Sequence, residues 1–287
     1  PFQAIFQLLA TNLGLPLLVI SATNPLMQRW IVSTLQDRVR VYRLFALSNL
    51  GSLLGLLCYP FLIEPAITLK EQVWFWSIGY VVFTAATGLC AIQAYRRASI
   101  PIVTKNIRNN WQTLSLWISL SATGSALLMA TTNQLTQNVA SVPFLWTIPL
   151  SLYLLSFIIV FERQQWYSPP FWSTLFIISL LAVFHLLGAS TEPDFIVQMF
   201  IYCLNLFSGC MICYGELARR KPLTEHLTSF YMYIAVGGVL GGVLVSIIAP
   251  QLFSGYWEYP LSLLTVYLIG GFGLVLKDRN RIIWAVG

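Results

Sequence analysis

"FYMYIAVGGVLGGVLVSIIAP" (residues 230–250) contains two Gly-Gly pairs, four residues apart, inside an apolar run. Glycines clustered in this way either cradle a phosphate or let two helices approach closely. A phosphate site needs a strand, a glycine turn and a helix N-terminus in an aqueous crevice. Here apolar residues flank the glycines on both sides for a full membrane crossing, so we interpret the run as a membrane-spanning helix.

The glycine spacing predicts the role of these residues. Gly237 and Gly241, like Gly238 and Gly242, are separated by four positions, which places all four along one side of a helix. A doubled small-x-x-x-small pattern of this kind lets a neighbouring helix pack closely. We therefore predict that the four glycines form a helix-packing seam.

Composition extends this interpretation to the whole chain. Of 287 residues, 57% are hydrophobic and only 9% are charged, with a mean hydropathy of +0.73. A soluble domain carries about a quarter charged residues, so lipid must surround most of this protein. The chain starts at Pro1, and a new apolar run begins at Ile282 close to its end. We therefore expect residues 1–287 to be one membrane domain that continues at both ends.

The fold class expected from these features is all-α, a polytopic transmembrane helical bundle of about nine spans. A helix needs about 20 apolar residues to cross the hydrocarbon layer. Nine runs qualify, with a partial tenth beginning at Ile282: residues 3–23, 44–63, 73–95, 113–133, 142–161, 170–190, 195–215, 229–252 and 259–276.

The basic residues predict the orientation of these spans. All of them except Lys70 lie in the odd-numbered gaps or after the ninth span. The positive-inside rule makes that side cytoplasmic, which places the N-terminus outside and the C-terminus inside. The net charge of +6 follows from this asymmetry and requires no nucleic-acid partner.

The remaining charged and metal-binding residue types limit the chemistry. Every Asp and Glu falls in a gap or at the edge of a span, which argues against a proton pump and leaves room for a neutral or zwitterionic solute. Cys210 and Cys213 form a C-x-x-C pair, but no second pair or flanking His completes a metal site. We expect no catalytic residue, metal or cofactor in these residues.

Polar side chains at two span ends are candidate solute ligands. Asn24 and Gln28 flank Pro25 where the first span ends, and Asn133 and Gln137 occupy the end of the fourth. Since proline removes a backbone donor, a frayed helix end lined with amides could hold a polar ligand. The same amides also fit ordinary helix caps.

His185 is the only imidazole expected in the middle of a span. It could relay protons or bind haem, or it could simply bond to a neighbouring helix.

A cytoplasmic helix latch is a further candidate. The loop "LQDRVRVYR" (35–43) contains an Asp-Arg pair between two spans, as in the signature loop of major-facilitator transporters, although both glycines of that signature are missing. An ordinary positive-inside loop would look similar. The candidate latch residues on this side are Asp37, Arg38, Glu216, Arg219 and Arg220.

Four segments resemble a known family: "ELARRKPLTEHLTSFYMYIAVGGVLGGVLVSIIAPQLFSGYWEYPL" (216–261), "LPLLVISATNPLMQRW" (15–30), "YRLFALSNLGSLLGLLCYPFLIEP" (42–65) and "VPFLWTIPLSLYLLSFIIVFE" (142–162). They are similar to bacterial fused membrane proteins that join a major-facilitator-like domain to a cytoplasmic spermidine-synthase-like domain. The resemblance implies a soluble domain beyond residue 287 that binds decarboxylated S-adenosylmethionine or a related cosubstrate. No residue of this chain carries that aminopropyl transfer, so whether the protein is an enzyme stays open.

Two functions are compatible with these features. The first is a transporter-like domain of the bacterial cytoplasmic membrane that moves or senses a small polar solute, for example a polyamine or another product of the fused domain. The alternative is a membrane anchor that assembles a cytoplasmic aminopropyltransferase-like enzyme at the membrane.

Overall fold

The computed structural model describes residues 2–34, 38–97, 111–136, 144–188, 194–222, 227–255 and 257–269, and these ranges contain helices but no strand. In the N-terminal part, the helical elements are α1 (Phe2–Leu9), the π-helical η1 (Ala10–Gly14), α2 (Leu15–Thr34), α3 (Arg38–Cys58), the π-helical η2 (Tyr59–Ile63), α4 (Glu64–Ala66) and α5 (Leu69–Arg97).

The C-terminal part begins with α6 (Trp111–Thr136), α7 (Phe144–Glu162), the short η3 (Gln164–Trp166), α8 (Pro169–Gly188) and α9 (Phe195–Arg219). It continues with α10 (Leu227–Val243), the π-helical η5 (Leu244–Ile248) and α11 (Ala249–Leu252). A further apolar helix covers Glu258–Ile269.

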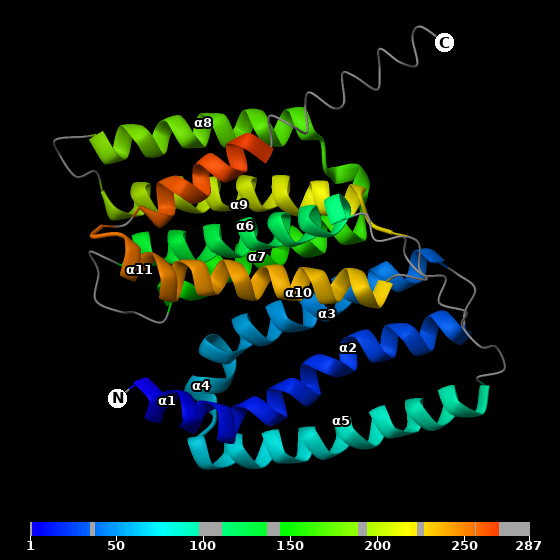
Figure 1. The fold of residues 1–287 in the computed structure, drawn as a ribbon. Helices are drawn as coiled ribbons and strands as arrows, with labels where there is room; N and C mark the ends of the chain where they lie inside the picture. Colours follow the sequence, from blue (N-terminus) through cyan, green and yellow to red (C-terminus); the bar gives the residue numbers. More distant parts are fainter. Residues whose placement is uncertain are drawn as a thin grey trace, which may run out of the picture.

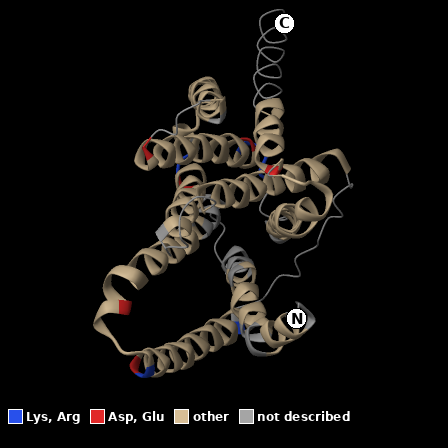
Figure 2. Ribbon diagram, turned by 90° about the vertical axis from the view of Figure 1, so that its left-hand side faces the viewer, with Lys and Arg blue, Asp and Glu red and all other residues tan. Residues whose placement is uncertain are grey.

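Seven helices in the described residues are long and apolar enough to cross a membrane. They cover Ala46–Ala66, Leu69–Arg96, Trp111–Thr136, Leu145–Glu162, Pro169–Leu186, Phe195–Arg219 and Ser229–Leu252. Shorter apolar helices, Leu17–Met27 and Glu258–Ile269, lie where the first and ninth spans are expected, while residues 270–276 and Ile282 fall outside the described residues. Charged residues lie mostly near helix ends and linkers, separated by long uncharged stretches (Figure 2).

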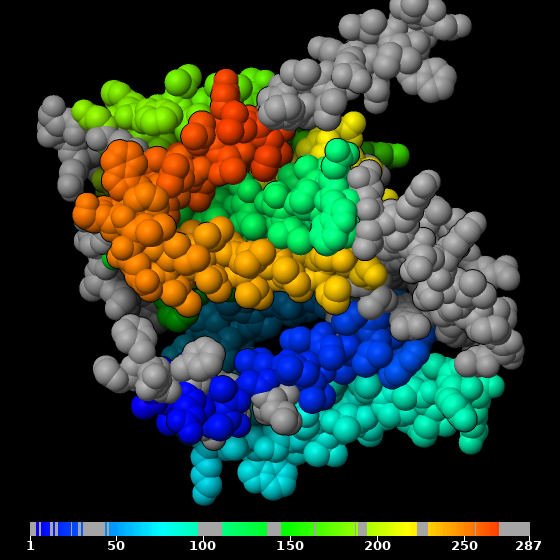
Figure 3. All heavy atoms as spheres, in the orientation of Figure 1, coloured from blue at the N-terminus to red at the C-terminus, as the bar shows by residue number. Residues whose placement is uncertain are grey.

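The helices form two regions (Figure 1). In the first, α6, α7 and α9 pack against one another, α10 packs on α6, and α8 covers the outer side of α9. Helix α3 packs along α7 and joins this bundle to the N-terminal part, where α2 lies against α5. Helix α5 forms the outer edge of the molecule, as the ribbon and the space-filling view both show (Figures 1 and 3).

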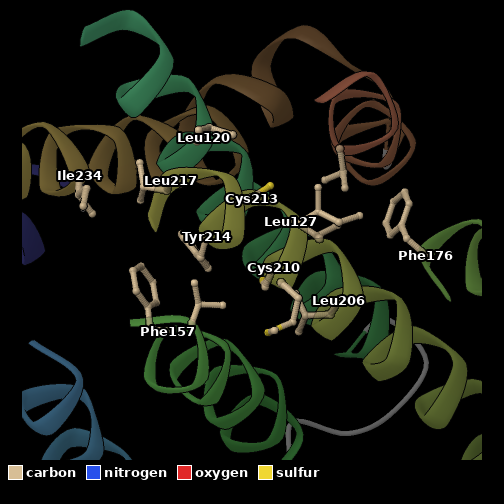
Figure 4. Close-up of a cluster of buried hydrophobic side chains, with 14 of the residues drawn as sticks. Leu120, Leu127, Phe157, Phe176, Leu206, Cys210, Cys213, Tyr214, Leu217 and Ile234 are labelled. Carbon is tan, nitrogen blue, oxygen red and sulfur yellow. The ribbon is translucent and has the colours of Figure 1, made fainter. Parts of the chain in front are cut away.

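The buried core lies between α6, α7 and α9 (Figure 4). The ring of Tyr214 from α9 stacks on Phe157 of α7 with 3.8 Å between ring centroids. Tyr214 fits because its hydroxyl occupies the position that a side chain on Gly124 would take. Leu127 similarly fills the space above Gly209, where an added Cβ would lie 2.5 Å from the leucine side chain. Small residues on one helix therefore receive large ones from the next.

The predicted end of the first span differs from the structure. The sequence predicts that the first span ends near residue 23 and frays at Pro25, but α2 continues through Pro25 to Thr34. The preceding turns extend over α1 and η1, so a helical segment follows the chain from Phe2 to Thr34. The proline is accommodated inside this helix, as often happens in membrane helices, and the frayed-end interpretation is wrong.

Candidate functional site

Close packing of α10 on α6 is set by two glycines. A Cβ added to Gly237 would lie 2.5 Å from the Ile118 carbonyl oxygen, and one added to Gly241 would overlap the Ala122 carbonyl group. These neighbours are backbone atoms, which cannot move away as a flexible side chain can. At both positions the α6 backbone therefore leaves no room for a side chain.

The other two glycines of the predicted seam behave differently. A Cβ on Gly238 would make ordinary contact with the Ser125 hydroxyl at 3.4 Å, whereas one on Gly242 would have nothing within 4 Å. Gly242 thus differs from the prediction that all four glycines line one seam. The reason is geometric, because consecutive helix residues are turned by about 100° and cannot all face one neighbour.

Serine hydroxyl groups of α6 bond to two neighbouring helices. Ser121 donates a hydrogen bond to the Ile234 carbonyl oxygen of α10 at 2.7 Å, and Ser125 lies 3.3 Å from the Tyr153 hydroxyl of α7. Such interhelical hydrogen bonds join membrane helices that have no hydrophobic force between them.

A buried carboxylate lies at one end of α9. Glu216 is only 3% exposed. One of its oxygens accepts hydrogen bonds from Arg219 Nη1 at 2.9 Å and from the Tyr167 hydroxyl at 3.2 Å. The other oxygen lies 3.4 Å from Arg220 Nη2. We call these four residues the Glu216 cluster. It satisfies a charge that would otherwise be costly to bury.

The Glu216 cluster joins three parts of the chain. Tyr167, from the α7–α8 connection, lies on α9 where Gly215 has no side chain. The Trp117 indole of α6 donates a hydrogen bond to the Arg220 carbonyl oxygen at 3.2 Å. Burial, reinforced by the neighbouring Glu216 carboxylate, raises the pKa of Tyr167, so this hydroxyl stays protonated and remains a donor.

Three of the candidate latch residues belong to this cluster, but the sequence does not predict its burial. It predicts that the seventh span ends at residue 215 and leaves Glu216 in a gap, whereas α9 continues to Arg219 and buries the carboxylate. Of the other candidate latch residues, Asp37 lies outside the described residues and Arg38 begins α3. The structure therefore brings together Glu216, Arg219 and Arg220.

Among the buried polar groups that have no hydrogen-bond partner in the described residues, two belong to non-aromatic side chains. Asn205 of α9 is fully buried; its amide nitrogen donates to the Ser179 hydroxyl of α8 at 3.0 Å, but its Oδ1 accepts nothing. The hydroxyl of Thr131 on α6 is equally buried and equally unpaired. An unpaired buried polar group costs on the order of 1–3 kcal/mol, which makes both residues candidates for a ligand site.

The pairing of α6 with α9 places these two residues at the same level. Gly124 faces Tyr214, and three residues further along α6, Leu127 faces Gly209. The helices therefore run antiparallel, and one further turn brings Thr131 to the level of Asn205. In the sequence, Asn205 is an amide in the centre of the apolar run 195–215, but Gln198 lies in the same run, so the pattern alone does not single it out.

The other predicted ligands are not assembled into one site. Asn24 and Gln28 lie inside α2, Asn133 is half-buried in the last turn of α6, and Gln137 falls outside the described residues. His185, expected in mid-span, instead lies exposed in the last turn of α8.

In the part of the chain that the structure describes, no group of three His, Cys, Asp or Glu residues could hold a metal ion.

Together, the fold and these clusters define an all-helical, multi-pass membrane protein. Its sequence and structure match no family model, no curated protein and no solved structure.

Proposed function

We propose that the chain is a transporter-like membrane domain that moves or senses a small polar solute without net charge. The observation that carries the proposal is the pair of unpaired polar groups on Asn205 of α9 and Thr131 of α6, both fully buried at one level of the bundle. Polar residues inside membrane spans are costly, and they commonly mark the path of a solute.

The chemistry of this position favours an uncharged ligand. Asn205 offers an acceptor, and the Thr131 hydroxyl can donate or accept. Neither group carries a charge, and Asn205 lies near the middle of α9, far from both of its ends. A hydroxyl or amide N–H of a solute would donate to Asn205 Oδ1, and a solute hydroxyl or carbonyl would accept from the Thr131 hydroxyl, without a charged partner.

The remaining parts of the proposal follow from the sequence. We infer a major-facilitator-like arrangement of about nine spans in the bacterial cytoplasmic membrane, with the N-terminus of this chain outside. In this orientation the Glu216 cluster lies at the cytoplasmic end of α9. There it would hold α6, α9 and the α7–α8 connection together on the side from which a fused spermidine-synthase-like domain would extend.

Transport in liposomes tests this proposal. Purified protein is reconstituted, and uptake of labelled glycerol, urea, alanine and putrescine is compared with uptake into empty liposomes. We expect saturable uptake of at least one uncharged or zwitterionic solute. Thr131→Val should abolish that uptake, because it removes the hydroxyl while keeping the shape of the side chain.

Thr132→Val is the matched control. Thr132 is adjacent, but its hydroxyl donates to the Leu128 carbonyl within α6. We expect this variant to transport like the wild type. The proposal fails if none of the solutes enters faster than into empty liposomes, or if the two valine variants behave alike. Saturable uptake of putrescine alone would favour the polyamine version of the function instead.

The membrane anchor remains the second candidate, and the closeness of packing favours it. Leu127, Leu206 and Met211 have no exposed surface, and the glycine contacts leave α6 and α10 little freedom to separate. A scaffold of this kind requires no moving parts. It predicts that a soluble domain following residue 287 keeps full aminopropyl-transfer activity when separated from the membrane part, and that Thr131→Val changes nothing.

A further inference from the structure

A pocket of about 400 Å³ lies between the end of α3 and the beginning of α7. We call it the α3–α7 pocket. Its lining consists of Leu56, Tyr59, Pro60, Glu64, Trp146, Thr147 and Leu150. It lies apart from Asn205, Thr131 and the Glu216 cluster, none of which lines it.

The local sequence explains how the pocket forms. Where α3 ends at Cys58, the chain continues through η2 and turns into α4 at Glu64. The Tyr59 hydroxyl lies 3.3 Å from Gln72 Oε1, and the Gln72 amide in turn donates to the Ile67 carbonyl oxygen at 3.0 Å. These bonds tie the turn between α3 and α5 together, so one wall of the pocket is fixed. The first turns of α7 supply the other wall.

The chemistry of the lining selects a class of ligand. The pocket has one carboxylate, two aromatic side chains and otherwise mainly apolar surface, and no basic residue lines it. Anions are therefore disfavoured. Aromatic rings beside a carboxylate bind ammonium groups through cation–π and ionic attraction. We propose that the α3–α7 pocket binds an alkylammonium group, with Glu64 as counter-ion and Tyr59 and Trp146 as aromatic walls.

The single carboxylate of the α3–α7 pocket, Glu64, can balance the charge of one ammonium group. A polyamine would bring further ammonium groups against the apolar residues Leu56 and Leu150, where they would lose hydration without gaining a partner. The site therefore fits a monocation with an apolar body better than a polycation.

Two sources can supply such a group. The pocket extends from the middle of the candidate span Ala46–Ala66 to its end, beside the first residues of the span Leu145–Glu162. Span ends meet the headgroup region of a bilayer, where choline and ethanolamine groups of lipids are concentrated. A small organic ammonium ion from the aqueous side presents the same chemistry. Neither source requires that the protein transport anything, so this site is independent of the function proposed above.

Binding of choline to the purified protein tests the site. The protein is delipidated in a maltoside detergent, and saturation-transfer NMR follows the choline methyl protons. We expect saturable binding that 3,3-dimethylbutan-1-ol, an uncharged analogue of the same shape, neither reproduces nor displaces. Glu64→Gln should weaken binding by about tenfold or more, because it removes the charge and keeps the size of the side chain.

Matched controls separate the pocket from general effects of charge and aromatic content. Glu162→Gln removes an exposed carboxylate at the other end of α7, and it should bind choline like the wild type. Trp146→Leu should weaken binding, whereas Trp111→Leu, at an exposed position outside the pocket, should not. Thermal denaturation of each variant establishes that it is folded. If Glu64→Gln does not fold, the tryptophan pair and the uncharged analogue still decide the outcome.

Nanodiscs distinguish the two sources. If choline binds in phosphatidylglycerol nanodiscs but is excluded in phosphatidylcholine nanodiscs, lipid headgroups occupy the pocket. Equal binding in both nanodiscs assigns it to a free ammonium ion. The proposal is overturned if wild-type protein shows no saturable choline binding in detergent and in phosphatidylglycerol nanodiscs, or if folded Glu64→Gln binds as tightly as the wild type.

Discussion

Helices α5 and α9 are both long and apolar enough to cross a membrane, yet their surroundings differ completely. Half of the residues in the most apolar part of α9 are buried inside the protein. In the corresponding part of α5, no residue is buried. On α5, consecutive aromatic residues Trp74, Phe75 and Trp76 are each more than 60% exposed. On α9, Cys210, Cys213 and Tyr214 have no exposed surface at all.

Hydropathy therefore identifies helices that fit in lipid, but it does not tell which of them pack together. In a membrane, association depends on close packing and on hydrogen bonds between helices. The glycines do not decide it alone, since Gly79 and Gly88 of α5 have nothing within 4 Å of an added Cβ. Small residues permit two helices to approach closely. The helices pack there only if a side chain or backbone of the neighbouring helix fills the space, as at Gly124 and Gly241.

The largest effect should come from the same substitution made in both regions. Gly241→Leu forces a side chain into the α6 backbone and should destabilise the bundle by about 3 kcal/mol or more, or prevent folding. Gly79→Leu in α5 should change stability by less than about 1 kcal/mol, because its surroundings are open. Unfolding in detergent, followed by circular dichroism, measures both.

Gly242→Leu is the control within α10, and we expect it to fold, because an added Cβ there meets nothing. Wild-type stability of Gly241→Leu would contradict the packing role of that glycine, and so would equal losses in all three leucine variants.

The next effect concerns the buried carboxylate. Glu216→Gln leaves two arginines without their counter-ion and should lower the free energy of unfolding by about 2 kcal/mol. Breaking a fully buried ion pair would cost more, but both arginines are partly exposed. The α5 counterpart, Glu71→Gln, changes an exposed carboxylate and should shift the melting temperature much less. A larger loss in Glu71→Gln than in Glu216→Gln would reverse the comparison.

A smaller effect is expected for the indole hydrogen bond between α6 and α9. Trp117→Phe removes the donor to the Arg220 carbonyl and should cost about 1 kcal/mol. Trp76→Phe on α5, where the indole is 68% exposed, should leave stability unchanged. Denaturant titration of both variants in the same detergent measures these effects. If Trp117→Phe and Trp76→Phe unfold at the same denaturant concentration, the Trp117 hydrogen bond contributes nothing to stability.

The smallest effect is a gain in the exposed helix. Gly88→Ala should stabilise α5 by about 0.5 kcal/mol, because alanine reduces the freedom of the unfolded chain and has room in the folded one. The slowing of amide hydrogen exchange in residues 80–97 measures this gain locally. Faster exchange there would mean that Gly88 packs against something in the membrane.

The apolar runs of the sequence predicted the helical class and most of the membrane helices, because the need to satisfy backbone groups in lipid leaves a long apolar run few alternatives. The helix ends predicted from the sequence were less accurate. Pro25 and Glu216 both resemble terminators in a sequence, yet α2 and α9 continue through them. Besides the nearby Arg219 and Arg220, Glu216 is bonded by Tyr167, forty-nine positions earlier, and no local pattern reveals that contact.

The candidate site was less predictable for a related reason. Glycine spacing identified a packing surface. Only the position of α6 in the structure shows that Gly241 contacts this helix and that Gly242 does not. Likewise, Asn205 is one polar residue among several in apolar runs. That its Oδ1 receives no hydrogen bond becomes visible only when α8 and α9 are placed together.

The π-helical turn η5 has a consequence for changes in the length of this part of the chain. Gly237, Gly241, Val245 and Ala249 are all buried at intervals of four, although in a regular α-helix each such step drifts by about 40°. The wider turn at Leu244–Ile248 offsets part of this drift. Inserting one further residue after Ser246 would turn Ala249 by about 100° away from its neighbours. Variants of this chain should therefore tolerate substitutions in η5 far better than insertions.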